Sequence, residues 1–285
     1  MNLWRLKIIA KLILSRLPLD YRSWSKFKLF KHGDMDNSEY AFNVLKKHVA
    51  HLDVKKNRTW KGLELGPGDG VMSALLAPIF YNGSIDLVDS GDFVNKNISV
   101  YKSHIDKYAR LNSQYEYSSL DFSKNLDKLL TSVGSNYYTQ GLTSMESLKA
   151  SSYDFIFSHA VFEHIRKSEF VDTIKECYRL LGSDGLMSHQ VDFRDHLGGQ
   201  LNNMRFSSKL WESDWFASQS GFYTNRMKIT EMIDICEKVG FSVEVYSVSM
   251  FDTVPIKASQ LAKEFIKLSK DDLLTSGAHL IMRKL

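Results

Sequence analysis

Cysteine and proline are scarce in this chain of 285 residues, which contains two cysteines and four prolines. Cys177 and Cys236 lie far apart in the sequence, and neither belongs to a CxxC pair or a Cys/His cluster. This pattern argues against a disulfide framework and a zinc site, and it favours a reduced, cytoplasmic protein. With 44% hydrophobic and 25% charged residues, the composition is that of an ordinary globular chain rather than a disordered or fibrous one.

Positive charge is not spread along the chain, although the net charge is +4. The first 31 residues contain eight Lys/Arg residues and one acidic residue, Asp20, and so carry a net charge of +7. The rest of the chain therefore carries slightly more acidic than basic residues, which argues against a nucleic acid as partner. The basic residues of this leader are Arg5, Lys7, Lys11, Arg16, Arg22, Lys26, Lys28 and Lys31.

Long apolar runs are also missing. The most apolar segment, LWRLKIIAKLILSRLP at residues 3–18, is interrupted by Lys7, Lys11 and Arg16. It is too short to span a bilayer and lacks the features of a secretory signal. Two interpretations stay open for residues 1–17: a helix packed on the following domain or a partner, or a helix resting on an anionic membrane surface with Trp4 as anchor. We expect residues 1–50 to form a helical extension before a domain at 51–285.

From residue 59 onward, short apolar runs alternate with helix-length segments, which is typical of an α/β fold with a parallel sheet. Apolar residues recur at helical spacing over 168–181 and 229–239. The polar segment 123–152 and the aromatic-rich segment 193–226 are expected to be insertions that cap an acceptor site. The pattern predicts strands at 60–65, 84–89, 114–118, 153–158, 185–191, 242–250 and 278–285, with a further helix at 258–268. The last two strands are expected to form a hairpin-like edge.

Three glycines stand at alternate positions directly after the first expected strand, in Glu64-Leu-Gly-Pro-Gly-Asp-Gly70. Glycine allows a sharp turn and a close approach of the backbone to a ligand, and the helix that follows presents unpaired N–H groups. Asp89 ends the second expected strand, where a carboxylate can accept hydrogen bonds from both hydroxyls of a ribose. The sequence therefore predicts a nucleotide-cofactor site at this turn.

The spacing separates the nucleotide classes. An NAD site of the G-x-G-x-x-G type would need glycine at position 71, which is Val71, and no phosphate-loop motif occurs in the chain. The E-x-G-x-G-x-G turn, with YDFIFSHAVFEHI at 153–165, instead resembles the class I S-adenosylmethionine-dependent methyltransferases of the type 11 group. The resemblance spans residues 59–192 and implies a Rossmann-like, seven-stranded sheet with helices on both faces.

The resemblance also implies roles for individual residues. The turn would hold the methionyl part of S-adenosylmethionine, Asp89 its ribose, and Asp121 with Phe122 its adenine, while Ser158 would line the reaction centre. Asp121-Phe122 is also a common turn pair, so a purely structural role stays open. The implied turn residues are Glu64, Gly66, Pro67, Gly68 and Gly70.

An oxygen acceptor is favoured by what does not follow the fourth expected strand. Neither an Asn/Asp-Pro-Pro-Tyr motif for amine methylation nor a cysteine for attack on a pyrimidine is found there. A looser resemblance of HQVDFRDHLGG at 189–199 to methyltransferases among bacterial surface-polysaccharide enzymes implies a sugar hydroxyl on a glycan or lipid-linked saccharide. Candidates for binding the acceptor are His164, Arg194, Tyr138, Asn203, Arg205 and Tyr223.

General-base candidates cluster where two strands are expected to end, because open parallel sheets bind ligands at that edge. Imidazole can accept a proton near neutral pH, and we place His196 before His159 as the base. Asp192 and Asp195 could assist, or with His196 could bind a divalent metal ion, although spacing alone predicts no metal site.

The sequence thus predicts a cytoplasmic, S-adenosylmethionine-dependent O-methyltransferase, which residues 1–17 could dock on the inner face of a membrane. Two alternatives stay open: methylation of a soluble small molecule, and a catalytically silent cofactor-binding scaffold. The sequence predicts no oligomeric state.

Overall fold

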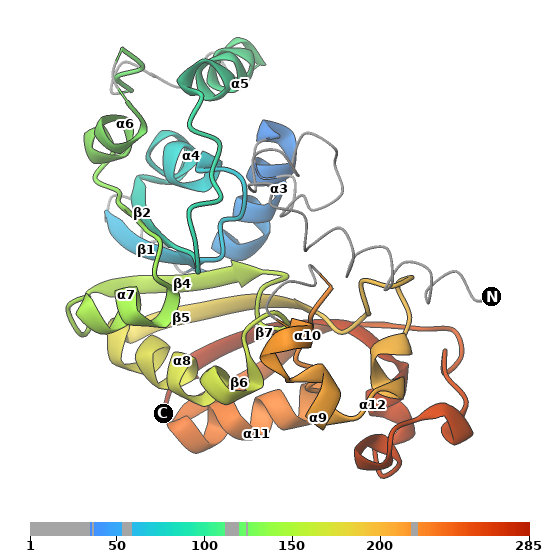
Figure 1. The fold of residues 1–285 in the computed structure, drawn as a ribbon. Coiled ribbons are helices and arrows are strands. Elements are labelled where there is room, and N and C mark those ends of the chain that lie inside the picture. The colour runs from blue at the N-terminus through green and yellow to red at the C-terminus, as the bar shows by residue number, and fades with distance from the viewer. Residues whose placement is uncertain (1–34, 36, 53–58, 112–119, 124, 218–221) are drawn as a thin grey trace. The chain divides into compact units, whose positions relative to one another are not determined.

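The computed structural model describes residues 35, 37–52, 59–111, 120–123, 125–217 and 222–285 (Figure 1). The expected leader helix and the strand expected at 114–118 lie outside these residues. The chain divides into two compact units, which are described separately. The glycine-turn unit comprises residues 31–159, 175–189 and 281–285, and the C-terminal unit comprises residues 160–174 and 190–280.

The strands form one seven-stranded sheet in the order β3-β2-β1-β4-β5-β7-β6, which confirms the Rossmann-like α/β prediction. Six of the seven expected strands are found close to their expected positions, and the last two are neighbours at one edge, as expected. The helices expected at 168–181 and 229–239 are α8 (Lys167–Leu180) and α11 (Ile229–Val239). The strands are β1 (Trp60–Leu65), β2 (Gly83–Val88), β3 (Tyr137–Tyr138), β4 (Tyr153–His159), β5 (Leu181–Asp192), β6 (Phe241–Met250) and β7 (Thr275–Lys284).

Strand β1 pairs in parallel with β2 on one side and with β4 on the other. In these pairings Leu65 lies opposite Val88 of β2 and opposite Ser158 of β4. The carboxyl ends of the three strands therefore meet at one edge of the sheet. The chain passes from β1 to β2 and β3 on one side of β1 and then crosses to β4 on the other side, and such a switch point is where open α/β sheets bind ligands.

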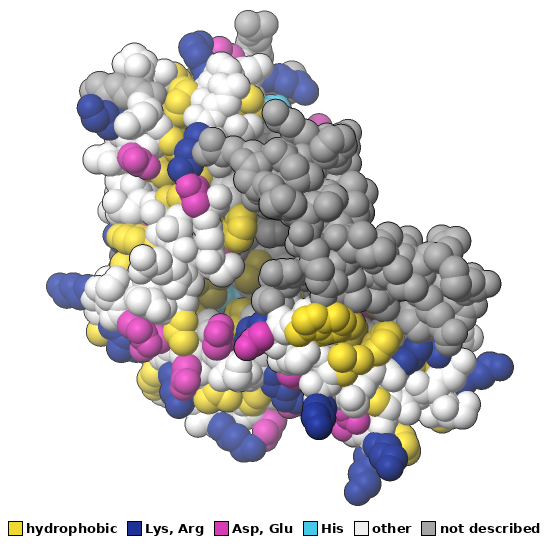
Figure 2. Space-filling model, in the orientation of Figure 1, with side chains coloured by type: hydrophobic (Ala, Val, Ile, Leu, Met, Phe, Trp, Pro, Cys, Tyr) yellow, Lys and Arg dark blue, Asp and Glu magenta, His cyan; other side chains and the backbone are white. Residues whose placement is uncertain are grey.

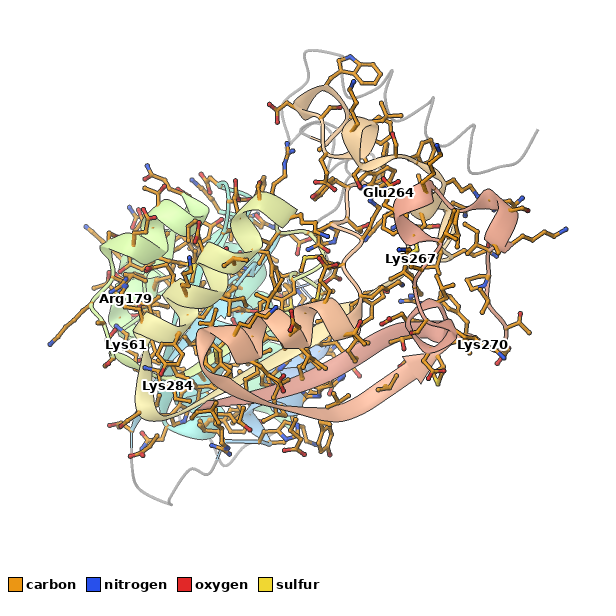
Figure 3. All side chains as sticks on the ribbon, turned by 90° about the horizontal axis from the view of Figure 1, so that it is seen from below. Lys61, Arg179, Glu264, Lys267, Lys270 and Lys284 are labelled. Atoms are coloured by element: carbon orange, nitrogen blue, oxygen red, sulfur yellow. The ribbon has the colours of Figure 1, made fainter. Side chains whose placement is uncertain are left out.

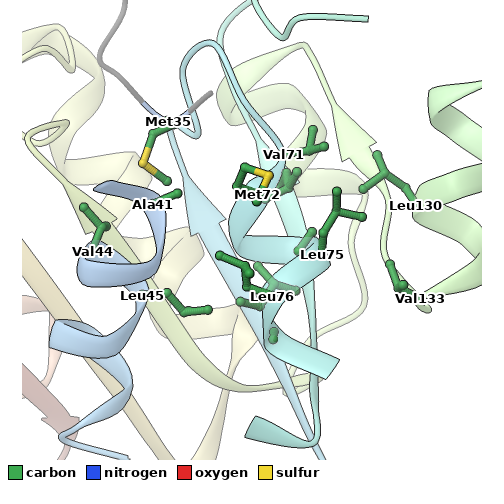
Figure 4. Close-up of a cluster of buried hydrophobic side chains, with 14 of the residues drawn as sticks. Met35, Ala41, Val44, Leu45, Val71, Met72, Leu75, Leu76, Leu130 and Val133 are labelled. Carbon is green, nitrogen blue, oxygen red and sulfur yellow. The ribbon is translucent and has the colours of Figure 1, made fainter. Parts of the chain in front are cut away.

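The core of the glycine-turn unit lies between the sheet and its helices (Figure 4). Helix α3 (Ser38–Val49) contributes Ala41, Val44 and Leu45, which pack with α4 (Met72–Tyr81). Residues 38–49 fall within the expected extension, yet α3 belongs to this core. Asn37 caps α3 by accepting the N–H groups of Glu39 and Tyr40.

The strand that pairs with β2 on its outer side is β3, at residues 137–138. It follows α5 (Ile98–Leu111) and α6 (Leu126–Ser132) and precedes α7 (Gly141–Ser147). Leu126, Leu129 and Leu130 of α6 are buried in the core. Residues 123–152, expected to form a cap, therefore contribute a core helix and a sheet strand. Arg179 of α8, labelled in Figure 3, donates to the carbonyl oxygens of Met145 and Leu148 at the end of α7, at 2.9 and 2.8 Å.

The C-terminal unit contains several short helices between β5 and β7. The prediction of a helix at 258–268 is wrong, because this segment forms two short 3₁₀ helices, η2 (Ala258–Gln260) and η3 (Lys263–Phe265). The Ala262 N–H donates to the carbonyl oxygen of Met204 at 2.9 Å, so a tertiary hydrogen bond replaces a helical one. The other helices of this unit are η1 (Asn202–Arg205), α9 (Ser208–Trp211), α10 (Asp214–Ala217) and α12 (Lys270–Leu274).

The described residues carry charges of both signs, and basic and acidic side chains are interspersed on the face shown in Figure 2. Among these residues, none of the helices combines the length and apolar character needed to cross a membrane. The basic leader is not described, so its interaction with a membrane remains a prediction.

Candidate functional site

The turn between β1 and α4 has the geometry that its glycines predict. Gly66 and Gly68 have φ angles of 66° and 68°, a left-handed backbone that glycine adopts without strain. The N-cap residue of α4, Val71, makes no side-chain hydrogen bond to the helix. The first N–H groups of α4 thus have no side-chain cap, and a helix start of this kind can bind a polar or anionic group.

Asp89 lies against this turn, as the spacing predicts. One carboxylate oxygen accepts the Gly68 N–H at 3.1 Å, and the other accepts the Ser90 N–H at 2.7 Å. Burial raises the pKa of Asp89 to about 6 despite these hydrogen bonds. At neutral pH the group is therefore mainly a carboxylate, and its oxygens can accept hydrogen bonds from the hydroxyl groups of a ribose-like ligand.

Glu64 is the most buried acid of the turn, with 2% of its surface exposed. The Ser73 hydroxyl on α4 donates a hydrogen bond to its carboxyl group. Burial, with a smaller effect of the Asp89 charge, raises the pKa of Glu64 to about 8. Among the described residues Glu64 forms no ion pair. A carboxyl group in this state gains most from a cationic ligand, because a nearby positive charge favours its ionised form.

Among the described residues, the strand that pairs with β2 on its outer side is β3, and Asp121 and Phe122 do not follow it. Asp121 accepts the Ser123 N–H at 3.1 Å in a local turn, and Phe122 packs against the core. These contacts favour the structural interpretation of the pair. The residues that do follow β3 are Thr139 and Gln140, which the sequence analysis missed.

The N–H of Gly141, which follows this short segment, donates to the Asp89 carbonyl oxygen at 2.8 Å. This hydrogen bond ties the exit of β3 to the exit of β2. Tyr138, the last residue of β3, is half-buried, and it lies at this edge rather than in a separate cap.

Two side chains at the end of β4 have histidine partners within the glycine-turn unit. Ser158 Oγ lies 2.7 Å from Nδ1 of His189, and both residues are buried. His159, one residue later, has its Nδ1 3.2 Å from Nε2 of His48. Leu65 and Ser158 are the last paired residues of β1 and β4, so Gly66 and His159 are the residues that follow them at the same edge of the sheet.

The acidic candidates after β5 already have partners within the C-terminal unit. Arg194 donates to both carboxylate oxygens of Asp192, at 2.9 and 2.7 Å. The carboxylate of Asp195 accepts the N–H groups of Leu197, at 2.9 Å, and of Asn202. Asp195 therefore holds the loop at 195–202 in shape.

No group of three or more His, Cys, Asp or Glu side chains that could hold a metal ion is found within the described ranges. Asp192, Asp195 and His196 thus do not gather there into the set considered above. His196 is exposed, and its ring packs against that of His164 at a centroid distance of 4.9 Å. Nδ1 of His164 lies 2.9 Å from the Tyr223 carbonyl oxygen.

Glu163 is a buried acid in this unit that the sequence analysis did not choose. One of its oxygens accepts the Asp192 N–H at 3.2 Å, and the other is buried without a hydrogen-bond partner among the described atoms. Burial and the charge of Asp192 raise the pKa of Glu163 to about 8, while Arg194 opposes the shift. The EH pair in the sequence was the available signal, but only burial identifies this acid as perturbed.

The remaining acceptor candidates are mostly inside the C-terminal unit. Asn203 is buried and donates to Thr224 Oγ1 at 2.9 Å, Arg205 donates to Asn202 at 3.1 Å, and the Tyr223 hydroxyl donates to Glu212 at 2.7 Å. Most of the aromatic residues at 193–226 also pack in a small core, and Trp215 is the one that is 59% exposed. That core is formed by Leu197, Phe206, Trp211, Phe216, Ala217, Phe222 and Tyr223.

Comparisons with solved structures find similar folds at low sequence identity. Phosphoethanolamine N-methyltransferase 2 from Haemonchus contortus is 15% identical, with a TM-score of 0.46, and the match covers 85% of this chain. The chain spans about half (52%) of that protein's chain. A SAM-dependent methyltransferase from Archaeoglobus fulgidus is 11% identical, with a TM-score of 0.48 and coverage of 93% of this chain and 100% of that one.

The PH0226 protein from Pyrococcus horikoshii is 12% identical, with a TM-score of 0.46 and coverage of 89% of this chain and 95% of that one. A search of curated proteins finds no match. A family model described as a methyltransferase domain matches residues 38–245, which is more than half of the chain. With its sheet order and its glycine turn, the chain belongs to the methyltransferase-domain family.

Proposed function

We propose that this protein is an S-adenosylmethionine-dependent O-methyltransferase. The observation that carries the proposal is the turn itself, where two left-handed glycines, an uncapped helix start and the Asp89 carboxylate lie together. S-adenosylmethionine, when bound, supplies a methyl group on a positively charged sulfur: the carbon–sulfur bond breaks as the bond to the acceptor forms, and the sulfur keeps the electron pair.

The residues of the turn suit the separate parts of that cofactor. Glu64 and Gly66 to Gly70 would hold the methionyl part, whose amino group is cationic, and Asp89 would accept the ribose hydroxyls. Pro67 lies within the turn and shapes it. Thr139 and Gln140, at the exit of β3, would hold the adenine in place of Asp121 and Phe122, to which the resemblance gave that role. Ser158 would line the reaction centre.

The described contacts favour His159 over His196 as the general base, which reverses the order inferred from the sequence. His159 lies at the same sheet edge as Gly66 and one strand away from it. Burial and the charge of Lys47 lower the pKa of His159 to about 4, so its ring is neutral at physiological pH and one nitrogen has a free electron pair. Alignment of the acceptor with the methyl donor can lower the activation barrier by about 7–11 kcal/mol. Proton removal by a base lowers it by about 3–5 kcal/mol, so alignment contributes more than the base.

For the acceptor we propose a sugar hydroxyl on a glycan or lipid-linked saccharide, methylated at the cytoplasmic face of a membrane that residues 1–17 contact. The support is the looser resemblance of residues 189–199 and the exposed Arg194, whose guanidinium can bind a phosphate or carboxylate of the acceptor. Asp192 then has the role of orienting Arg194.

One observation favours a second acceptor class, a soluble small molecule. Most of the aromatic residues at 193–226 could stack on a sugar ring if they were exposed, but they pack in their own core. Liposome sedimentation separates the two acceptor classes: removal of residues 1–17 should abolish sedimentation if the acceptor is membrane-bound, and it should change nothing if the acceptor is soluble.

The activity itself is tested with S-adenosylmethionine labelled in the methyl group. Label should pass to a hydroxyl of a glycolipid or sugar fraction in the presence of the wild-type protein, and a Gly68→Arg variant should give none. Cofactor binding without transfer to any acceptor would indicate the catalytically silent scaffold instead.

A further inference from the structure

A buried chain of three side chains connects β5 to β4 through α3. Oγ of Ser188 lies 2.8 Å from Nδ1 of His48, and Nε2 of His48 lies 3.2 Å from Nδ1 of His159. Ser188 and His48 are fully buried, and His159 is partly exposed. All three residues belong to the glycine-turn unit. Both nitrogens of His48 thus face a hydrogen-bonding group, and one of those groups is the proposed base.

The position of His48 is fixed by the packing of α3. Its ring lies 5.2 Å from that of Phe157, and it meets the His159 ring edge-on at 5.4 Å. Just before α3, the Met35 N–H donates to the Asp69 carboxylate at 3.0 Å, and Asp69 belongs to the glycine turn. The helix that carries His48 is therefore tied to the same turn as the proposed cofactor site.

The number of ring protons limits the states of this chain. Between Nε2 of His48 and Nδ1 of His159 a hydrogen bond needs one proton, and each neutral imidazole carries one. If His48 donates, the proton of His159 must be on its Nε2, and that nitrogen cannot accept another. If His159 donates, its Nε2 has a free electron pair, and His48 must donate from Nδ1 to Ser188.

The second arrangement is the one that a protonated His159 also requires. A cationic imidazole carries protons on both nitrogens, so its Nδ1 must donate and His48 must accept. The ring thus keeps the same hydrogen bond to His48 before and after it takes a proton on Nε2. Such a partner fixes both the orientation and the tautomer of a base.

We propose that His48 is a positioning residue that holds His159 with its Nδ1 donating, so that Nε2 faces the acceptor as the proton-accepting atom. The inference rests on the proposed function, in which His159 is the base. In the reaction the acceptor's O–H bond breaks, its proton goes to Nε2 of His159, and its oxygen forms the new bond to the methyl carbon.

Burial and the charge of Lys47 oppose protonation of His159, so the hydrogen bond to His48 has to offset them. Lys47 on the same helix disfavours the cationic ring electrostatically, and burial does so more strongly. The Tyr40 ring meets the His159 ring edge-on at 6.2 Å. Among the described residues, Nε2 of His159 has no hydrogen-bond partner. The protonated state of His159 is therefore stabilised by the hydrogen bond that its Nδ1–H donates to His48.

Two substitutions of His48 separate hydrogen bonding from packing. His48→Phe keeps an aromatic ring beside Phe157 but has no acceptor for His159. His48→Gln places an amide oxygen near the position of Nε2 and restores the acceptor. Ser188→Ala removes only the outer end of the chain. His104→Gln, on α5, is the control for loss of an unrelated histidine.

The measurement is nitrogen-15 NMR of the histidine rings between pH 4 and 8, with the His159 signals assigned by their loss in His159→Gln. In the wild type and in His48→Gln, Nδ1 of His159 should carry the proton. In His48→Phe the proton should move to Nε2 in most molecules, and Ser188→Ala should cause a smaller shift. If both His48 variants retain the wild-type tautomer, or if both lose it equally, the inference is wrong.

Should His48→Phe fail to fold, as judged by circular dichroism, the wild-type tautomer and Ser188→Ala still decide: a proton on Nε2 of His159 in the wild type overturns the inference. Once an acceptor is known, His48→Phe should lower kcat by up to about 100-fold and leave the KM for S-adenosylmethionine unchanged. The NMR result does not depend on an acceptor, so failure of the proposed function is read separately, from absence of S-adenosylhomocysteine binding.

Discussion

Replacement of Glu163 by glutamine tests the most perturbed acid of the C-terminal unit. Glu163 is 2% exposed, and its carboxyl group accepts a hydrogen bond from the Asp192 N–H. A glutamine oxygen can accept the same hydrogen bond. Its second oxygen is buried without a partner among the described atoms. The substitution therefore removes the ionisation of this group and changes little else in its surroundings.

The size and sign of the effect follow from the pKa. The folded protein releases this proton at a pKa of about 8, whereas an unfolded chain releases it near pH 4.3. The contribution of the protonated carboxyl to stability is complete below about pH 4.3 and is lost as pH rises through 8. Each unit of pKa difference between the folded and unfolded protein corresponds to about 1.4 kcal/mol. The loss in unfolding free energy therefore approaches ~5 kcal/mol, which is an upper bound because local rearrangement reduces it.

Urea unfolding at pH 5, 6, 7 and 8 measures the effect as the difference in unfolding free energy between Glu163→Gln and the wild type. The difference should be smallest at pH 5 and should grow in favour of the variant as the pH rises. The difference isolates Glu163, because Glu64 contributes the same trend to both proteins. Glu244→Gln on the exposed β6 strand is the matched control. A difference that does not change with pH would refute the reasoning.

Three further predictions concern the turn and the small aromatic core. Gly68→Ala should weaken S-adenosylhomocysteine binding by at least about 10-fold in calorimetry, because a φ angle of 68° strains any residue other than glycine. Gly182→Ala is the control, because the φ angle of Gly182 is ordinary, and it should leave binding unchanged. Asp89→Asn should also weaken binding by about 10-fold or more, through loss of a charged acceptor; unchanged affinity would remove Asp89 from the site. Trp211→Ala should destabilise the protein by about 3–5 kcal/mol in urea unfolding, because the Trp211 side chain is fully buried. Trp215→Ala should have almost no effect, because Trp215 is 59% exposed. Equal effects of the two substitutions would contradict the packed core.

The sheet and the glycine turn could be predicted from the sequence because their signals are local. Trp60, Leu63 and Leu65 indicate a buried strand at 60–65, and alternate glycines directly after it specify a tight turn. Asp89 was placed correctly because the distance from the turn to the end of the next strand varies little in such folds. Each of these features depends on residues close together in the chain.

The features that the sequence did not predict depend on distant residues. Strand β3 has two residues, too few for a periodic pattern. The 258–268 segment has a helical pattern, but Ala262 bonds to the backbone of Met204. His48 is an ordinary helix residue until the fold brings it to Ser188, 140 positions later. Burial likewise distinguishes Glu163 from other acids only in the folded chain.

The proposed function depends on binding of S-adenosylmethionine at the turn after β1. Calorimetric titration of the full-length protein with S-adenosylhomocysteine measures this binding, with Gly68→Arg as the paired variant. We expect the wild type to bind one molecule per chain and the variant to bind none at matched folding. Equal binding by both proteins, or no binding by the wild type at saturating ligand, would contradict it.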